Sequence, residues 1–282
     1  MSENHILNLS CDDRIGIVAA VSACLSESRF NITASHQFSD PISNRFFMRI
    51  AFSGRPEAIP ALRIEIAKVS SKFAMKWTIW DAAERPRVLL MVSKFGHCLN
   101  DLLYRQNIGA LNIEIPIVVS NHETFRPLCE AHKIPFRHLP VSAADKPARE
   151  AELVQIIGEQ KIELVVLARY MQVLSSDLCR ELSGRAINIH HSFLPSFKGA
   201  APYQQAYGRG VKLIGATAHY ITEDLDEGPI IEQEVSRVDH ARSAEELVAT
   251  GRDVESIVLA RAVQAHVERR VFLNGSKTVV FR

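Results

Sequence analysis

The stretch DAAERPRVLLMVSKF, residues 81–95, contains the boundary between two segments of different pattern. The polar, proline-containing AAERP at 82–86 is typical of a linker. The apolar run RVLLMVS that follows is typical of a parallel strand buried on both faces. We therefore expect two domains, residues 1–83 and 84–282, and the length of 282 residues favours the same division.

Apolar runs alternate with helical patterns after this boundary. Strand-like runs lie at 114–121, 134–141 and 162–170. The alternation predicts an α/β fold with a doubly wound, mostly parallel sheet. Further on, residues 241–270 predict one long amphipathic helix or a pair of helices, and Asn274–Gly275 predicts the turn of a closing hairpin.

The first 83 residues have a different order of elements. Strands are expected at 5–10, 31–40, 45–54 and 73–81, with helices after Asp12 or Asp13 and over about 57–71. This βαββαβ order predicts a small α+β sandwich. From the residues alone, such a domain is a structural cap or a dimerisation module.

Composition excludes several classes of protein. A net charge of +1 and a pI near 7.7 argue against nucleic-acid binding. No apolar stretch is long enough to span a membrane, and the N-terminus lacks the pattern of a secretory signal. The five cysteines are scattered without CxxC spacing. We therefore expect reduced thiols in a cytoplasmic protein, with neither a disulfide framework nor a zinc site.

The segment AINIHHS, residues 186–192, places polar side chains at the end of an apolar run. Because side chains alternate along a strand, Asn188 and His190 are expected on one face and His191 on the other. An amide beside an imidazole suits a carbonyl whose oxygen gains negative charge. Two other interpretations stay open: histidines that are merely hydrogen-bonded, and a metal site. A serine nucleophile at Ser192 is disfavoured because no GxSxG elbow surrounds it.

A second candidate is GATAHYITEDLDEGPIIEQEV, residues 215–235, in which two apolar strands flank an acidic loop. Asp226 precedes the Gly-Pro pair where the chain returns to the core, and His219 lies seven residues earlier. A partly buried carboxylate near an imidazole holds a water molecule and takes its proton. The other interpretation of this acidic cluster is an ordinary solvated turn.

The turn after the first strand of the second domain, SKFGHC, does not match a dinucleotide fingerprint. Gly96 is its one glycine, and Lys94, Phe95 and His97 are too bulky for backbone amides to wrap around a phosphate. A nicotinamide-dependent enzyme is therefore not expected.

Together these motifs resemble those of the formyltransferase-fold enzymes that use 10-formyltetrahydrofolate. The resemblance rests on NIH, which contains Asn188 and His190 and is followed by a proline, and on AHYITEDLD, which contains His219 and Asp226. It implies that Asn188, His190 and Asp226 form the catalytic trio, with His219 beside them. It also implies a pterin pocket and neighbouring substrate contacts, made by Leu167, Met171, Gln172, Val173, Leu174, Thr222, Lys94 and Gly96.

Within that family the chain is most similar to the members that hydrolyse 10-formyltetrahydrofolate. VSKFGHCLNDLLYR (92–105), LARYMQVL (167–174) and GRDVESIVLARAV (251–263) carry this likeness. Related transferases hold the phosphate of their acceptor in a glycine-rich turn, whereas Lys94-Phe95-Gly96-His97 stands at that position here. The obstruction leaves water as the expected nucleophile.

The N-terminal βαββαβ segment resembles an ACT domain. The resemblance implies a homo-oligomer, a dimer or a tetramer, in which paired domains bind a small amino acid such as glycine or methionine. The matching positions are Asp13, Gly16, Asn31 and Ile32. Oligomerisation without a ligand is the alternative for this domain.

The mechanism implied by the resemblance needs no metal and no cofactor. Asp226 deprotonates a water that attacks the formyl carbon, and Asn188 and His190 stabilise the oxyanion. His190, or a water held by His219, then protonates N10, so that formate and tetrahydrofolate leave. Formate production would supply purine biosynthesis and balance the folate pools. The alternatives are formyl transfer to a small amine and a folate sensor without activity.

Overall fold

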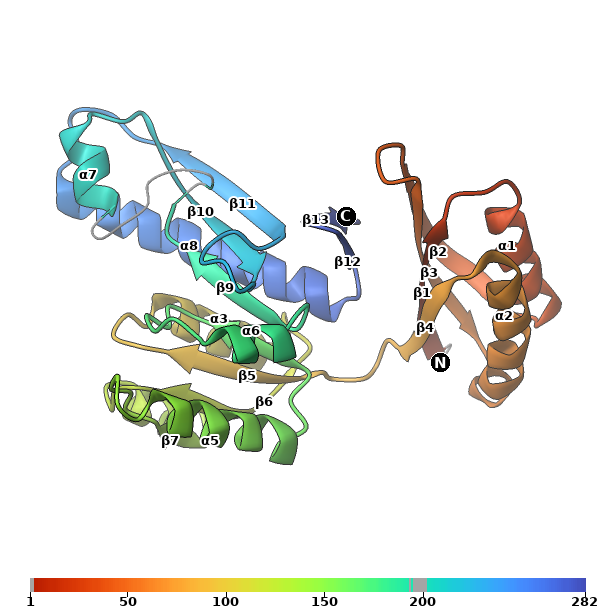
Figure 1. Cartoon of the computed structure of the whole chain (residues 1–282), viewed down its shortest axis with the longest axis horizontal. Helices are drawn as coiled ribbons and strands as arrows, with labels where there is room; N and C mark the ends of the chain where they lie inside the picture. The colour runs from red at the N-terminus through yellow and green to blue at the C-terminus, as the bar shows by residue number, and fades with distance from the viewer. Residues whose placement is uncertain (1–2, 193, 195–201) are drawn as a thin grey trace. The chain divides into compact units, whose positions relative to one another are not determined.

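The computed structural model describes residues 3–192, 194 and 202–282 (Figure 1). The chain forms two compact units: Met1–Glu84 with Glu268–Arg282, and Arg85–Val267. Among the described residues, no helix combines the length and the apolar character needed to cross a membrane.

Unit 1 is a four-stranded antiparallel sheet with two helices on one face. Its strands are β1 (Glu3–Asp12), β2 (Asn31–Asp40), β3 (Arg45–Gly54) and β4 (Lys76–Asp81), in the order β2-β3-β1-β4. Its helices are α1 (Ile17–Glu27) and α2 (Ile59–Phe73), the latter preceded by the 3-10 turn Pro56–Ala58. Val21 and Ile66 of these helices share one core cluster with Leu9 and Ile50 of the sheet. The predicted βαββαβ order is confirmed.

The C-terminal hairpin completes unit 1. The sequence correctly predicts the hairpin, β12 (Val271–Asn274) and β13 (Lys277–Val280), but the division at residue 84 assigns it to the second domain. Along β3, Phe46 and Met48 face the helices, so Phe47 faces the opposite side. There Phe47 is 1% exposed and its ring lies 5.8 Å from that of Phe272. Covering this second apolar face is the physical reason for the different boundary.

Polar contacts also attach the C-terminal segment to unit 1. The guanidinium of Arg49 donates two hydrogen bonds to the carbonyl of Glu268, at 3.0 and 3.2 Å. The amide of Asn274 donates to Asp40 at 2.6 Å. These contacts hold both ends of the segment against the sheet.

Phe272→Ala tests the role of the hairpin. The variant removes the ring packed on Phe47 and Phe281, and we expect the free energy of unfolding of unit 1 to fall by about 1–3 kcal/mol. Both tryptophans, Trp77 and Trp80, lie in unit 1, so their fluorescence during denaturant titration reports on it selectively. Leu273→Ala is the matched control because Leu273 is 47% exposed. Equal effects of the two substitutions would contradict this assignment.

Unit 2 is a seven-stranded sheet in the order β11-β10-β9-β8-β5-β6-β7. Its first five strands in sequence are parallel: β5 (Arg87–Val92), β6 (Glu114–Ser120), β7 (Phe136–His138), β8 (Leu164–Leu167) and β9 (Ala186–His190). The strands β10 (Leu213–Tyr220) and β11 (Ile230–Arg237) extend the sheet in antiparallel pairing. This arrangement confirms the predicted mostly parallel α/β sheet.

The helices of unit 2 are α3 (His97–Asn107), α4 (Arg126–Ala131), α5 (Lys146–Glu159), α6 (Ser176–Glu181), α7 (Pro202–Gly208) and α8 (Ala244–Val267). Residues of α5 and α6 pack into one core cluster with β5 and β8. Helix α8 is continuous over 24 residues, which settles the choice between one helix and a pair. It contacts β9, β10 and β11 as well as α3.

The strand order reverses between β5 and β8. From β5 the chain runs outward through β6 and β7, then returns to the other side of β5 for β8 and β9. Open α/β sheets bind ligands beyond the carboxyl ends of their strands at such a reversal. Leu167 ends β8 and His190 ends the neighbouring strand β9, so the topology brings LARYMQVL (167–174) beside AINIHHS (186–192).

Candidate active site

Asn188 and His219 face each other across two antiparallel strands. They are partners in the register of β9 and β10, and Asn188 Nδ2 lies 3.3 Å from His219 Nε2. His219 Nδ1 lies 2.9 Å from the carbonyl oxygen of Tyr220, which only accepts hydrogen bonds. His219 therefore carries a proton on Nδ1 and directs Nε2 towards Asn188.

The loop between β10 and β11 turns sharply to place Asp226 over these strands. Asp226 has a φ of 59°, in the left-handed region. Gly228 lies so close to β10 that an added Cβ would be 1.7 Å from the carbonyl oxygen of Tyr220. Tyr220 donates its backbone N–H to the carbonyl of Pro229 at 3.0 Å. Glycine at 228 thus permits the close approach that fixes Asp226.

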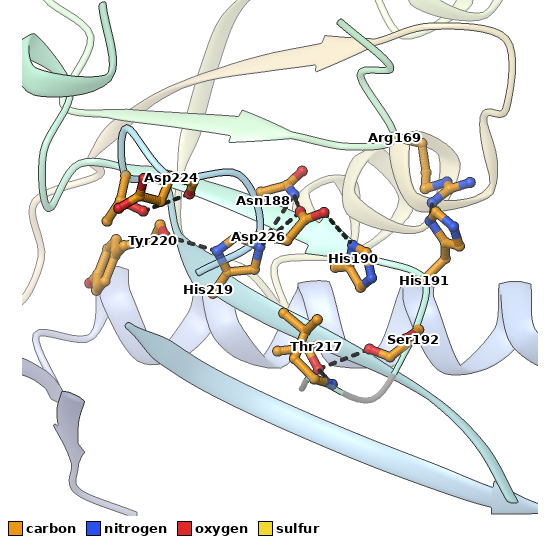
Figure 2. Close-up of polar contacts among 12 residues, drawn as sticks. Arg169, Asn188, His190, His191, Ser192, Thr217, His219, Tyr220, Asp224 and Asp226 are labelled. Carbon is orange, nitrogen blue, oxygen red and sulfur yellow. Dashed lines mark hydrogen bonds and ion pairs between the residues drawn. The ribbon is translucent and has the colours of Figure 1, made fainter. Parts of the chain in front are cut away.

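The carboxylate of Asp226 joins the four candidate catalytic residues into one cluster (Figure 2). Asp226 Oδ2 lies 3.1 Å from His190 Nδ1. Asp226 Oδ1 lies 3.4 Å from Asn188 Nδ2 and 3.7 Å from His219 Nε2. Asn188 and His190 reach it from the same face of β9, as the alternation of a strand predicts. The structure brings Asn188, His190, His219 and Asp226 together.

Electrostatics keep Asp226 ionised. Burial by itself raises the pKa of this carboxyl, but hydrogen bonds and the charges of His190 and His219 outweigh burial and hold the pKa well below its usual range. At neutral pH Asp226 is therefore a carboxylate that accepts hydrogen bonds strongly. A carboxylate of such low pKa is a weak base on its own.

A cavity of about 510 Å³, including its open mouth, lies beside this cluster. Asn188, His219 and Asp226 form its polar end. Five of the predicted substrate contacts line it: Leu167, Gln172, Val173, Leu174 and Thr222. Tyr170, Cys179, Ile221, Glu223, Asp224 and Leu225 complete the wall. The cavity thus combines an apolar slot with a polar end.

Three predicted substrate contacts do not line this cavity. Met171 follows β8 and is 52% exposed, and its backbone N–H donates to Ser93 Oγ at 2.9 Å. Lys94 and Gly96 lie in the turn after β5. An added Cβ on Gly96 would be 2.3 Å from the ring of Phe125, so this glycine is packed against an aromatic side chain.

His191 differs from the prediction. The rings of His190 and His191 stack, with centroids 4.9 Å apart and planes at 24° (Figure 2). Alternation placed them on opposite faces, but β9 ends at His190, so His191 no longer follows the pattern of a strand. Pro195, the proline that follows NIH in the resemblance, lies outside the described residues. His191 contacts Arg169, and Arg169 contacts Glu255. Nothing in the local sequence around these residues predicts either contact.

One group of potential metal ligands occurs among the described residues: His97, Cys98 and Glu255, whose donor atoms lie within 4.8 Å of one another. Glu255 already receives hydrogen bonds from His97 and from Tyr203, each at 2.7 Å. Burial raises the pKa of the Cys98 thiol, which disfavours the thiolate that binds metal. The residues present therefore do not fit a metal ion.

The four predicted effector contacts form two separate pairs in unit 1. Asp13 and Gly16 lie at the start of α1, beyond the end of β1 that pairs with Arg45. Asn31 and Ile32 begin β2 and pair with Ser53 and Phe52, at the other end of the sheet. The length of the strands separates the two pairs by roughly 25 Å. One copy of the chain does not bring them together.

Comparisons with known proteins identify the family of this chain. The formyl transferase family matches residues 86–263. The chain is 51% identical to a formyltetrahydrofolate deformylase from Corynebacterium sp. (strain P-1), over 100% of both chains. A solved formyltetrahydrofolate deformylase from Burkholderia mallei covers 99% of this chain and 100% of its own, with 53% identity and a TM-score of 0.95.

A more distant structure is the glycinamide ribonucleotide transformylase 1 of Symbiobacterium toebii, which has a TM-score of 0.65 and 26% identity. The match covers 70% of this chain and 95% of that one. The fold of unit 2 is thus that of a formyl transferase. Within that family, the chain belongs to the formyltetrahydrofolate deformylases.

Gly228→Ala tests how the loop places Asp226. The new Cβ would collide with the carbonyl of Tyr220, so the loop must move, and we expect about 1–3 kcal/mol of destabilisation. Calorimetry should show a lower unfolding temperature for unit 2. Gly158→Ala is the matched control, since a Cβ there meets no atom within 4 Å. An unchanged unfolding temperature for Gly228→Ala would contradict the packing described.

Proposed function

We propose that the chain hydrolyses 10-formyltetrahydrofolate to formate and tetrahydrofolate at the Asn188–His190–Asp226 cluster. The observation that carries the proposal is the sharing of one ionised carboxylate by an amide and two imidazoles, at the polar end of an apolar cavity. The names of the relatives point to the same substrate.

The cavity suits a folate. Leu167, Val173 and Leu174 offer an apolar slot for the flat pterin ring, and the loop of Thr222 and Asp224 supplies polar groups for its ring nitrogens. A pterin in this slot would direct N10 and its formyl group towards the polar end, where Asn188 and Asp226 lie.

The chemistry proposed is the addition of water to the formyl carbon. Asp226 accepts a hydrogen bond from the water and orients it. Because the pKa of Asp226 is lowered, we infer that Asp226 does not hold the proton from the water alone. The proton is shared between Asp226 and His190, which is paired with it. The amide of Asn188 donates to the oxyanion of the tetrahedral intermediate. The C–N10 bond then breaks as N10 takes a proton, and formate leaves.

His190 is the proposed source of the proton for N10. Its Nδ1 is bound to Asp226, an acceptor, so Nδ1 carries a proton and Nε2 is the nitrogen that exchanges one. Nε2 has no hydrogen-bond partner among the described residues. A water held by Nε2 of His219 is the second route.

Asp226→Asn tests the carboxylate. Asparagine tolerates the left-handed backbone of this position, so the loop should stay in place while the charge is lost. We expect kcat to fall by about a hundredfold to ten-thousandfold. Formate release from 10-formyltetrahydrofolate is the measurement, and Asp253→Asn, on the exposed face of α8, is the control. Near-normal turnover would reject the role of Asp226.

Formyl transfer to a small amine is the second candidate, favoured by the similarity of unit 2 to a transformylase. The same assay separates the two functions, because hydrolysis releases formate with no amine present. A transferase would leave the formyl group on the folate until an acceptor is added.

We propose that unit 1 is an ACT-like regulatory domain of a homo-oligomer. The distance between Asp13–Gly16 and Asn31–Ile32 within one copy supports a site that two copies build together. Glycine or methionine is the proposed effector. Formate for purine biosynthesis and balanced folate pools is the proposed role of the reaction. All five cysteines are buried free thiols, which supports a cytoplasmic location.

Calorimetric titration of the full-length protein with glycine and with methionine tests the regulatory proposal. Saturable heat with either amino acid is expected, and Asn31→Ala should abolish it. Absence of heat with both would leave unit 1 with a structural role alone.

A further inference from the structure

A buried polar network lies on the side of His190 opposite Asp226. Glu255 of α8 is 1% exposed and accepts hydrogen bonds from the hydroxyl of Tyr203 and from His97, each at 2.7 Å. Arg169 Nε lies 3.2 Å from the same carboxylate. Burial alone raises the pKa of Glu255, but the hydrogen bonds of His97 and Tyr203 and the charge of Arg169 lower it. Glu255 is therefore ionised and anchors Arg169.

The backbone holds Arg169 in an uncommon conformation. Its φ is 67°, in the left-handed region, and its carbonyl accepts the N–H of Ser93 at 3.1 Å. A non-glycine residue keeps such a conformation when the surrounding structure imposes it. The guanidinium is 2.7 Å from His191, and this contact connects the network to the stacked histidines (Figure 2).

The contact between Arg169 and His191 fixes a protonation state. Arg169 Nη1 lies 2.7 Å from His191 Nδ1, and a guanidinium only donates hydrogen bonds. His191 Nδ1 is therefore without a proton, and the neutral ring carries its proton on Nε2. In agreement, burial, reinforced by the charges of Arg169 and His190, lowers the pKa of His191 to about 4.

The charge of His191 matters because of its neighbour. Its ring stacks on His190 at 4.9 Å, and a second positive charge at that distance would oppose protonation of His190. The charged and titratable groups that face His191 are Arg169 after β8, His190 on β9, Tyr203 on α7, Glu255 on α8 and Asp226 before β11. The two cationic neighbours favour a neutral ring.

We propose that Arg169, anchored by Glu255, is a positioning residue that keeps His191 neutral, so that the proton exchanged during hydrolysis resides on His190. The inference rests on the proposed function. Arg169 contacts His191 and is not among the described residues that line the cavity, so Arg169 and Glu255 are assigned an action through the histidine pair.

The direct test is ¹⁵N NMR of histidine-labelled full-length protein. The unprotonated Nδ1 and protonated Nε2 of His191 should give the shifts of a single neutral tautomer, unchanged between pH 5.5 and 8.5. His191→Asn assigns the resonance. Titration of His191 within that range, or a proton on Nδ1, would overturn the proposal. This measurement needs no activity, so its failure is distinct from failure of the proposed function.

The matching kinetic test replaces the ion pair by two amides, Arg169→Gln with Glu255→Gln, which leaves no buried charge of this pair uncompensated. Without the charge of Arg169, the pKa of His191 should rise, and a larger fraction of His191 should be protonated at pH 6 than in the parent, although burial still lowers the pKa. We therefore expect the ratio of kcat at pH 6 to kcat at pH 8 to be lower in the double variant than in the parent, with KM unchanged. The control is Arg261→Gln with Glu234→Gln, an exposed ion pair also involving α8.

His191→Asn provides a second variant if the double substitution does not fold. The amide oxygen of asparagine can accept the hydrogen bond of Arg169, and the amide carries no positive charge at any pH tested. The pH dependence of kcat on the acid side should therefore match that of the parent. A parental pH ratio in the double variant, or a shifted acid limb in His191→Asn, would overturn the proposal.

Discussion

The carboxylate of Asp226 is shared by side chains from two strands, and the arrangement of the site depends on this interaction. An ionised group that is largely withdrawn from water must be compensated by donors. His190 and Asn188 of β9 supply them, with His219 of β10 nearby. The antiparallel register of β9 and β10 sets Asn188 opposite His219, and Gly228 lets the loop close over both. The cluster is therefore a product of strand register rather than of flexible loops.

The sheet topology explains why this cluster has a cavity beside it. Reversal of the strand order between β5 and β8 leaves a crevice beyond the carboxyl ends of β8 and β9. The segment after β8 supplies much of the apolar wall, and Asn188 of β9, His219 of β10 and Asp226 of the following loop supply the polar end. On the side of His190 away from Asp226, Arg169 and Glu255 form an ion pair that is buried inside unit 2. His190 thus lies between the carboxylate of Asp226, which lines the cavity, and a buried polar network.

Patterns of short range predicted most of this arrangement. Alternation along β9 placed Asn188 and His190 on one face, and the Gly-Pro turn indicated that Asp226 returns to the core. Features that depend on distant segments were not predictable. Arg169 and Glu255 are 86 positions apart, and neither position shows locally that its charge is buried. The sequence predicted the hairpin at Asn274. It did not predict that the hairpin covers one face of β3. His191 departs from its prediction because alternation ends where the strand does.

The most direct measurement of the central claim is a crystal structure of the protein with a hydrolysis-resistant 10-formylfolate analogue. We expect the pterin between Leu167, Val173 and Leu174, with the formyl carbon in contact with Asn188 and a water bound to Asp226. A formyl group bound away from the shared carboxylate, with Asn188 and Asp226 directed elsewhere, would contradict it.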